Sequence, residues 1–385
     1  MRILYYCQSL VGVGHLACSL RIIEELVPYA EVDLIHGGLD TATMFEHPRL
    51  RSLRLATLLH DAASGSFFDP HRTHSVDAIW ALRSTQIAAF LRDRYDAIVV
   101  EFYPFGRRRF KAEIMELFRE VRATSGPVPI FTSVREVLIP RPLEMERRMV
   151  ESVRKHIHTV FVRSDPEVIR LDDTFSLTHE IRDRLVYTGY ISPPPSAVWP
   201  VRRKQILVSQ GGGNVGAELL QAAIRVAPLM PEYRFVLAAG SRTSTAELAA
   251  LQAGVHSTNV RITPFLADFQ HRLRESAASI SMGGDNTLLD VITARTPALA
   301  YPYQGNPEQR LRIAKFAQKG LLTALDAADL APERLASLLG SALNAPLPEH
   351  PIAADGARVT SARIREILAA AVTARSMSTE RAILT

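Results

Sequence analysis

A histidine follows a glycine-containing turn near the start of the chain. Gly12 and Gly14 come directly before His15, after a β-forming run from Ile3 to Tyr6. We expect His15 at the carboxyl end of a first strand, where open α/β sheets bind ligands. An imidazole titrates near neutral pH and can take a proton from a hydroxyl group, so we predict a general base. A histidine that caps the helix or packs in the core is the alternative.

Two further glycine turns each precede a helically spaced apolar run. The free N–H groups and the dipole at a helix start attract anions, and glycines let a ligand come close, so both turns predict binding of a diphosphate. Short polar residues follow the second turn, where they can also cap the helix. The residues concerned are Gly211, Gly212, Gly213 and Asn214 in the first turn, and Gly283, Gly284, Asp285, Asn286 and Thr287 in the second.

Two charged residues follow other β-forming runs in the first half of the chain. Glu101 comes directly after the run 97–100, and Arg135 lies shortly after the run 128–131. If the sheet is parallel, these strand ends share one edge with His15. We therefore predict that Glu101, Arg135, Gly12 and Gly14 contact an acceptor; capping of loops is the other interpretation.

The order of elements predicts an α/β protein with two Rossmann-like domains facing each other across a cleft. Each half alternates strands and helices and has a glycine turn after its first strand. The dinucleotide fingerprint is absent, because Gly12-x-Gly14 lacks the third glycine. We expect a first domain over 1–190, a proline-rich linker over 191–204 and a second domain over 205–352. Residues 353–385 should form a helix that packs back on the first domain, followed by a tail.

Composition is that of an ordinary enzyme. Of the 385 residues, 47% are hydrophobic and 22% are charged, with a formal net charge of +5. No apolar run approaches the roughly 18 residues of a membrane span, and the start does not resemble a secretory signal, so we expect a cytoplasmic protein. Its basic clusters are typical of solvated helix faces; the alternative is an anionic partner, such as a phosphorylated acceptor or the inner membrane face, rather than nucleic acid. The two cysteines are expected to pack in the core.

The motifs together resemble the GT-B glycosyltransferases, and among them the branch of MurG, the N-acetylglucosaminyltransferase of peptidoglycan synthesis. Four family motifs are matched in order within residues 1–345, and a further segment from Glu101 to Arg107 resembles bacterial predicted glycosyltransferases. The matched segments are Gly12-Val13-Gly14-His15, Ser209-Gln210-Gly211-Gly212, the run from Ser281 to Asp290, and Pro302-Tyr303-Gln304 with Gln309-Arg310.

The resemblance implies roles for four residues of the second half. Asp290 stands where the family has a glutamate that binds the ribose hydroxyls, and it is one methylene shorter. Gln309 would hold the hydroxyls of the donor sugar. Arg310 replaces a second family glutamine, which suggests a different or charged donor sugar. Phe265 would lie beside the base.

With this resemblance, the sequence predicts an inverting, metal-independent glycosyltransferase that uses a nucleotide diphosphate sugar, expected to be UDP-linked, with His15 as base. The resemblance implies that the domain over 1–190 binds the acceptor and the domain over 205–352 binds the nucleotide sugar. No cofactor or metal is expected, since the chain contains no Asp-x-Asp triplet. The partners would be the nucleotide sugar and a hydroxyl acceptor, either a small metabolite or lipid-linked. Two alternatives stay open: a sugar-nucleotide 2-epimerase of the same fold, and a non-catalytic subunit that binds nucleotide sugar.

Overall fold

The computed structural model describes residues 1–9, 14–38, 45–61, 65–192, 200–211, 216–240, 243–346 and 352–383, with backbone alone for 374–383. The chain forms two compact units. The first comprises Met1–Ser164, Leu171–Ile191 and Asp355–Thr385, and the second comprises Asp165–Arg170 and Ser192–Ala354.

The first unit is built on a parallel sheet of seven strands, ordered β3-β2-β1-β6-β7-β8-β9. Val, Ile, Phe and Tyr dominate the five inner strands, which are buried on both faces, as expected for parallel strands covered by helices, whereas the edge strands β3 and β9 are only partly buried. The strands are β1 (Arg2–Gln8), β2 (Glu31–Gly37), β3 (Leu50–Arg54), β6 (Ala97–Glu101), β7 (Ile130–Arg135), β8 (Thr159–Arg163) and β9 (Leu185–Tyr187).

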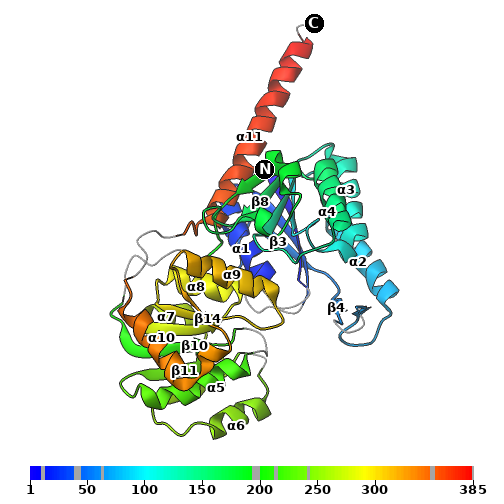
Figure 1. Ribbon diagram of the computed structural model, residues 1–385. Coiled ribbons are helices and arrows are strands. Elements are labelled where there is room, and N and C mark those ends of the chain that lie inside the picture. The colour runs from blue at the N-terminus through cyan, green and yellow to red at the C-terminus, as the bar shows by residue number, and fades with distance from the viewer. Residues whose placement is uncertain are drawn as a thin grey trace. The chain divides into compact units, whose positions relative to one another are not determined.

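Helices cover both faces of this first sheet. Leu4 and Tyr6 of β1 pack in one core cluster with α2, α3 and α4, whereas Ile3, Tyr5 and Cys7 pack in another with α1 and α11. Figure 1 shows α3 and α4 side by side along the first of these faces. The helices are α1 (Gly14–Leu26), α2 (Val76–Phe90), α3 (Lys111–Ser125), α4 (Leu143–His156) and α11 (Gly356–Ile383).

The last helix belongs to the first unit although it follows the second unit in the chain. Its residues Ile364 and Leu368 are buried in the cluster that contains α1. Ser361 donates a hydrogen bond from Oγ to the carbonyl oxygen of Glu25, 2.7 Å away. The helix runs from Gly356 to Ile383 and so fills most of the range 353–385 expected to hold a helix and a tail.

The second unit repeats the design with six parallel strands, ordered β12-β11-β10-β13-β14-β15. Its strands are β10 (Arg203–Ser209), β11 (Arg234–Ala238), β12 (Val260–Thr263), β13 (Ser276–Met282), β14 (Ala298–Tyr301) and β15 (Thr323–Ala324). Its helices are α5 (Ala217–Val226), α6 (Thr245–Ala253), α7 (Phe269–Glu275), α8 (Asp285–Thr293), α9 (Pro307–Gln318) and α10 (Pro332–Asn344).

These elements confirm the predicted class, an α/β protein with two Rossmann-like sheets. The expected linker lies mostly outside the described residues, and β10 begins at Arg203, two positions before the expected second domain. A short antiparallel pair, β4 (Leu59–His60) and β5 (Phe67–Phe68), projects from the first unit. Among the described helices, none is long and apolar enough to cross a membrane.

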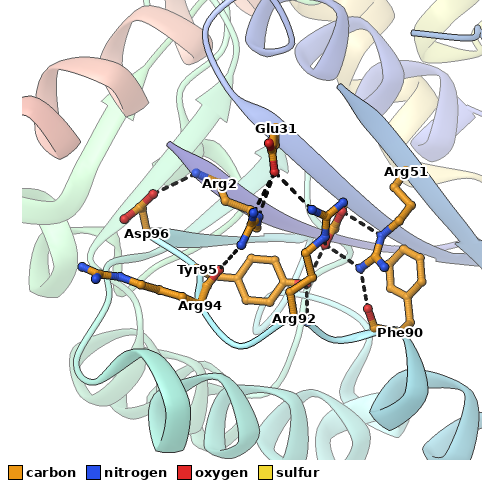
Figure 2. Close-up of polar contacts among 9 residues, drawn as sticks. Arg2, Glu31, Arg51, Phe90, Arg92, Arg94, Tyr95 and Asp96 are labelled. Carbon is orange, nitrogen blue, oxygen red and sulfur yellow. Dashed lines mark hydrogen bonds and ion pairs between the residues drawn. The ribbon is translucent and has the colours of Figure 1, made fainter. Parts of the chain in front are cut away.

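A charged cluster ties together the amino ends of the first strands (Figure 2). Its centre is Asp33 of β2, which is buried and accepts hydrogen bonds from Arg51, at 2.8 and 3.1 Å, and from the Tyr95 hydroxyl at 2.7 Å. Arg92 pairs with Asp33 and with Glu31. Because a buried carboxylate without partners would be costly, this network fixes β2 against β3 and against the segment that enters β6.

Candidate active site

His15 lies at the carboxyl edge of the first sheet, as the sequence predicts. It is the second residue of α1, whose buried residues Leu16, Leu20 and Ile23 hold the helix against the sheet. Its Nδ1 lies 2.6 Å from Oε1 of Glu101, the last residue of β6. The parallel pairing of β1 with β6, which sets Tyr6 opposite Val100, brings these two strand ends together.

Glu101 is fully buried and is surrounded by cationic groups. Arg163 at the end of β8 lies 3.5 Å from Oε1, and Arg107 lies 3.6 Å from Oε2. Burial by itself raises the pKa of this carboxyl, but His15, Arg107 and Arg163 outweigh it and lower the pKa to about 2. Glu101 is therefore an anion at neutral pH.

An ionised Glu101 decides which nitrogen of neutral His15 carries the proton. The carboxylate can only accept, so Nδ1 donates to it and Nε2 keeps a lone pair. The His15 side chain is 19% exposed, whereas that of Glu101 is 0% exposed. The arrangement is that of a general base held and oriented by a buried carboxylate.

The ring of Phe102 packs beneath this pair. It lies 5.4 Å from the His15 ring, and the guanidinium groups of Arg107 and Arg135 lie over it at 5.8 and 5.3 Å. Phe102 has a positive φ of 66°. A side chain at Gly106 would have its Cβ 2.2 Å from the Phe102 ring, so only glycine permits this packing. His15 and Arg135, a predicted acceptor residue, therefore both pack against the ring of Phe102.

A buried ion pair supports the end of β1, the strand that leads to His15. Arg83 of α2 is fully buried and pairs with Glu113 at 2.7 Å. Its Nη2 also donates to Oε1 of Gln8, and the Gln8 amide donates to the carbonyl oxygen of Ser9, each at 2.8 Å. These contacts fix the backbone immediately before the turn that contains Gly12.

The second unit has a pocket of about 420 Å³ at the carboxyl edge of its sheet. Four predicted donor residues line it: Gly211, Phe265, Thr287 and Asp290. Phe265 is 62% exposed, although it is a large apolar residue. Gly211 has a positive φ of 80°, and a Cβ there would lie 3.8 Å from Oγ1 of Thr287, so the two turns approach each other.

The second glycine turn brings two helices close. Gly283 directly follows β13, and a Cβ there would lie 2.7 Å from Ile313 and 3.0 Å from the Cβ of Gln309, both in α9. Gly284 is the N-cap of α8 and has no side chain to accept from the first-turn N–H groups. Asp285 and Asn286 lie in that first turn, half-buried.

Asp290, one turn further along α8, is held by a residue that the sequence did not indicate. Gln270 of α7 donates from Nε2 to Oδ1 of Asp290 at 2.8 Å, and both line the pocket. Gln309 does not line this pocket; its Oε1 accepts from the N–H of Tyr303 at 2.9 Å. Arg310 is exposed at the start of α9.

The predicted residues therefore fall into two groups, one in each unit. His15, Glu101 and Arg135 gather at the edge of the first sheet, with Gly14 at the start of α1. Gly12, Gly212, Gly213 and Asn214 lie outside the described residues. Sequence reasoning assigned Glu101 to acceptor contact and missed its contact with His15. It also missed Arg163 and Gln270, and the position of Arg163 at a strand end was the one available signal.

Residues 207–363 match the model of a family described as the glycosyltransferase family 28 C-terminal domain. An Acidiphilium cryptum protein, named UDP-N-acetylglucosamine–N-acetylmuramyl-(pentapeptide) pyrophosphoryl-undecaprenol N-acetylglucosamine transferase, is 29% identical over 168 residues. The match covers 41% of this chain and 43% of that protein. The chain thus spans less than half the length of this curated relative.

Two solved structures have a similar fold over nearly the whole chain. MurG of Acinetobacter baumannii is 13% identical, with a TM-score of 0.59, and the match covers 96% of this chain and 99% of that one. LpCGTa, solved in complex with UDP, is 12% identical, with a TM-score of 0.57, and the match covers 95% and 94% of the two chains. At such identities the likeness shows the fold alone.

Proposed function

We propose that the protein is an inverting, metal-independent glycosyltransferase, a proposal supported by the match of residues 207–363 to the glycosyltransferase family 28 C-terminal domain and by the fold that the chain shares with MurG. It moves a sugar from a nucleotide diphosphate sugar, UDP-linked, to a hydroxyl acceptor. The observation that carries the proposal is the contact of His15 with buried, ionised Glu101 at the carboxyl edge of the first sheet.

His15 acts as the general base on the acceptor. Its Nε2 takes the proton of the acceptor hydroxyl as that oxygen attacks the anomeric carbon of the donor. The bond from the anomeric carbon to the diphosphate breaks, and the nucleoside diphosphate leaves with the electron pair. Glu101 stabilises the imidazolium that forms and keeps Nδ1 as the donor of their hydrogen bond. A single displacement of this kind inverts the anomeric configuration.

The second unit binds the donor in the pocket around Asp290. The exposed ring of Phe265 offers a surface on which the base can stack. Asp290, oriented by Gln270, accepts hydrogen bonds from the ribose hydroxyls. Gly211 and the first-turn N–H groups of α8 approach the diphosphate, because a helix start favours anions and glycine allows close contact. Gln309 and Arg310 contact the donor sugar.

UDP as the nucleotide is supported by the names of similar proteins. The Acidiphilium relative is named for transfer from UDP-N-acetylglucosamine, and LpCGTa was solved with UDP. The absence of an Asp-x-Asp triplet supports a site in which helix starts, rather than a metal clamp, offset the charge of the departing diphosphate.

A thermal-shift panel of UDP, dTDP and GDP sugars tests donor binding, because a ligand of the native state raises its apparent stability in proportion to affinity. We expect a UDP sugar to raise the Tm most. Release of UDP in the presence of hydroxyl acceptors then tests transfer. An epimerase would instead convert the UDP sugar with no acceptor present, and a non-catalytic subunit would bind the sugar nucleotide without releasing UDP.

A further inference from the structure

The first unit contains a pocket that belongs neither to the proposed donor site nor to the His15–Glu101 pair. It is a pocket of about 940 Å³ between the start of α3 and the amino-terminal half of α4, the two helices that lie side by side in Figure 1. All of its lining residues lie between His60 and Ser152, so the pocket is complete within this unit.

The walls of this pocket are strongly basic. The only acidic residue among its lining residues is Glu151. Six cationic side chains contribute to the lining: Arg107, Arg108, Arg109, Lys111, Arg141 and Arg148. Such an excess of one charge inside a concavity favours an anionic ligand.

Four of these six cations have no carboxylate partner within the part of the chain that the structure describes. Arg148 pairs with Glu144, and Arg109 donates to the carbonyl oxygen of Gly65. For Arg108, Lys111 and Arg141, all exposed at the rim, the described residues include no acidic partner. Solvated surface arginines are common, but they seldom converge on one hollow.

Arg107 connects this pocket to the His15–Glu101 pair. Its side chain is only 10% exposed and lies 3.6 Å from Glu101, too far for a hydrogen bond. Its Nε and Nη2 atoms are buried, and among the described residues neither makes a hydrogen bond. Buried guanidinium donors without acceptors are costly, and an oxyanion in the pocket would supply the acceptors.

We propose that this pocket binds a phosphate-bearing group of the acceptor, an assignment that rests on the proposed function. Several converging guanidinium groups match a ligand with more than one anionic oxygen better than a single carboxylate, since each can bind a phosphate oxygen pair. The apolar side chains of Phe105, Met145 and Met149 line the same pocket and cover a carbon portion of the ligand. Arg107 then links the bound phosphate to the pair that activates the acceptor hydroxyl.

Titration of the full chain with sodium pyrophosphate tests this site, by calorimetry at constant ionic strength with UDP at saturation. The variant is R108Q/R141Q, which changes two exposed rim residues. The matched control is R94Q/R182Q, which removes the same charge from two exposed arginines of the same unit outside the pocket. We expect the wild type and the control to bind pyrophosphate equally, and R108Q/R141Q to bind at least tenfold more weakly.

If all three proteins bind pyrophosphate equally, or if none binds it, the proposal is overturned unless the two variants differ in binding to lipid vesicles. Sedimentation with vesicles of phosphatidylcholine containing 30% phosphatidylglycerol forms the second arm. Vesicle binding that R108Q/R141Q loses and R94Q/R182Q keeps identifies the phosphate as that of a lipid headgroup. If neither probe distinguishes the variants, the pocket is not a phosphate site. The thermal shift with UDP sugars, measured on the same proteins, reports separately whether the proposed function fails.

Discussion

The Nδ1 atom of His15 lies 2.6 Å from Oε1 of Glu101, joining the start of a helix to the end of a strand 86 positions later in the chain. Glu101 in turn lies within 3.6 Å of Arg107 and Arg163. The carboxylate therefore has two functions, to orient His15 and to balance two cations in a buried environment. These two functions can be separated by experiment.

Glu101→Gln tests the orienting function. The amide keeps the size of the carboxylate but cannot stabilise an imidazolium, so we expect kcat to fall about 100-fold while KM stays near the wild-type value. The rate of UDP release measures this. Glu366→Gln, at an exposed residue of α11 that pairs with Arg363 and lines neither pocket, is the control and should leave kcat unchanged. An unaltered kcat in Glu101→Gln would remove this carboxylate from the mechanism.

The charge of Glu101 also makes stability depend on pH. Its pKa falls from an ordinary 4.5 to about 2 on folding, so its contribution is complete above pH 4.5 and is lost as the pH falls towards 2. At neutral pH the contribution is about 3 kcal/mol. Urea unfolding of the wild type and Glu101→Gln between pH 7 and pH 3 should show the difference in unfolding free energy shrinking as the pH falls. A constant difference would contradict the depressed pKa.

Gly106→Ala should disturb the active site through Phe102. The added Cβ would lie 2.2 Å from the Phe102 ring, so the ring must move away from His15. We expect a loss of about 1–3 kcal/mol in unfolding free energy, together with a lower kcat. Gly340→Ala is the matched control, because nothing lies within 4 Å of its Cβ position in α10, and it should be neutral or stabilising by up to about 1 kcal/mol.

Asp290 and Gln270 should affect donor binding together. Asp290→Ala removes the acceptor of the ribose hydroxyls, so the Tm shift with UDP should fall to near zero. Gln270→Leu removes only the group that orients Asp290 and should weaken UDP binding about tenfold. Gln252→Leu, at an exposed residue of α6, is the control. If both site variants keep the wild-type shift, the ribose lies elsewhere.

The sequence predicts the inner strands of both sheets and the position of His15 well, because these depend on local patterns. Apolar periodicity from Leu16 to Leu26 suffices for α1, and the β-forming run at Ile3 suffices for β1. Local patterns also indicate that strand ends share an edge. They do not reveal which strands are neighbours, and the adjacency of β1 and β6 is what brings Glu101 to His15.

The residues that the sequence missed act through long-range contacts. Gln270 belongs to no motif, and its importance comes from the packing of α7 against α8. In the sequence, Arg163 is an ordinary polar residue at the end of a β-forming run. Only the strand order β6-β7-β8 brings it within reach of Glu101, at the end of β6. Arg83 lies in a helix with no distinct apolar face, so its complete burial against Glu113 and Gln8 has no local signal.

The central claim is tested most directly by the rate of UDP release by His15→Ala, with the UDP sugar that raises the Tm most and an acceptor that the wild type glycosylates. Loss of the base should lower kcat by a factor of about 100 to 10,000, while the Tm shift with the UDP sugar stays unchanged, since the donor is bound by the second unit. A His15→Ala protein that binds the donor and releases UDP at the wild-type rate would contradict the account.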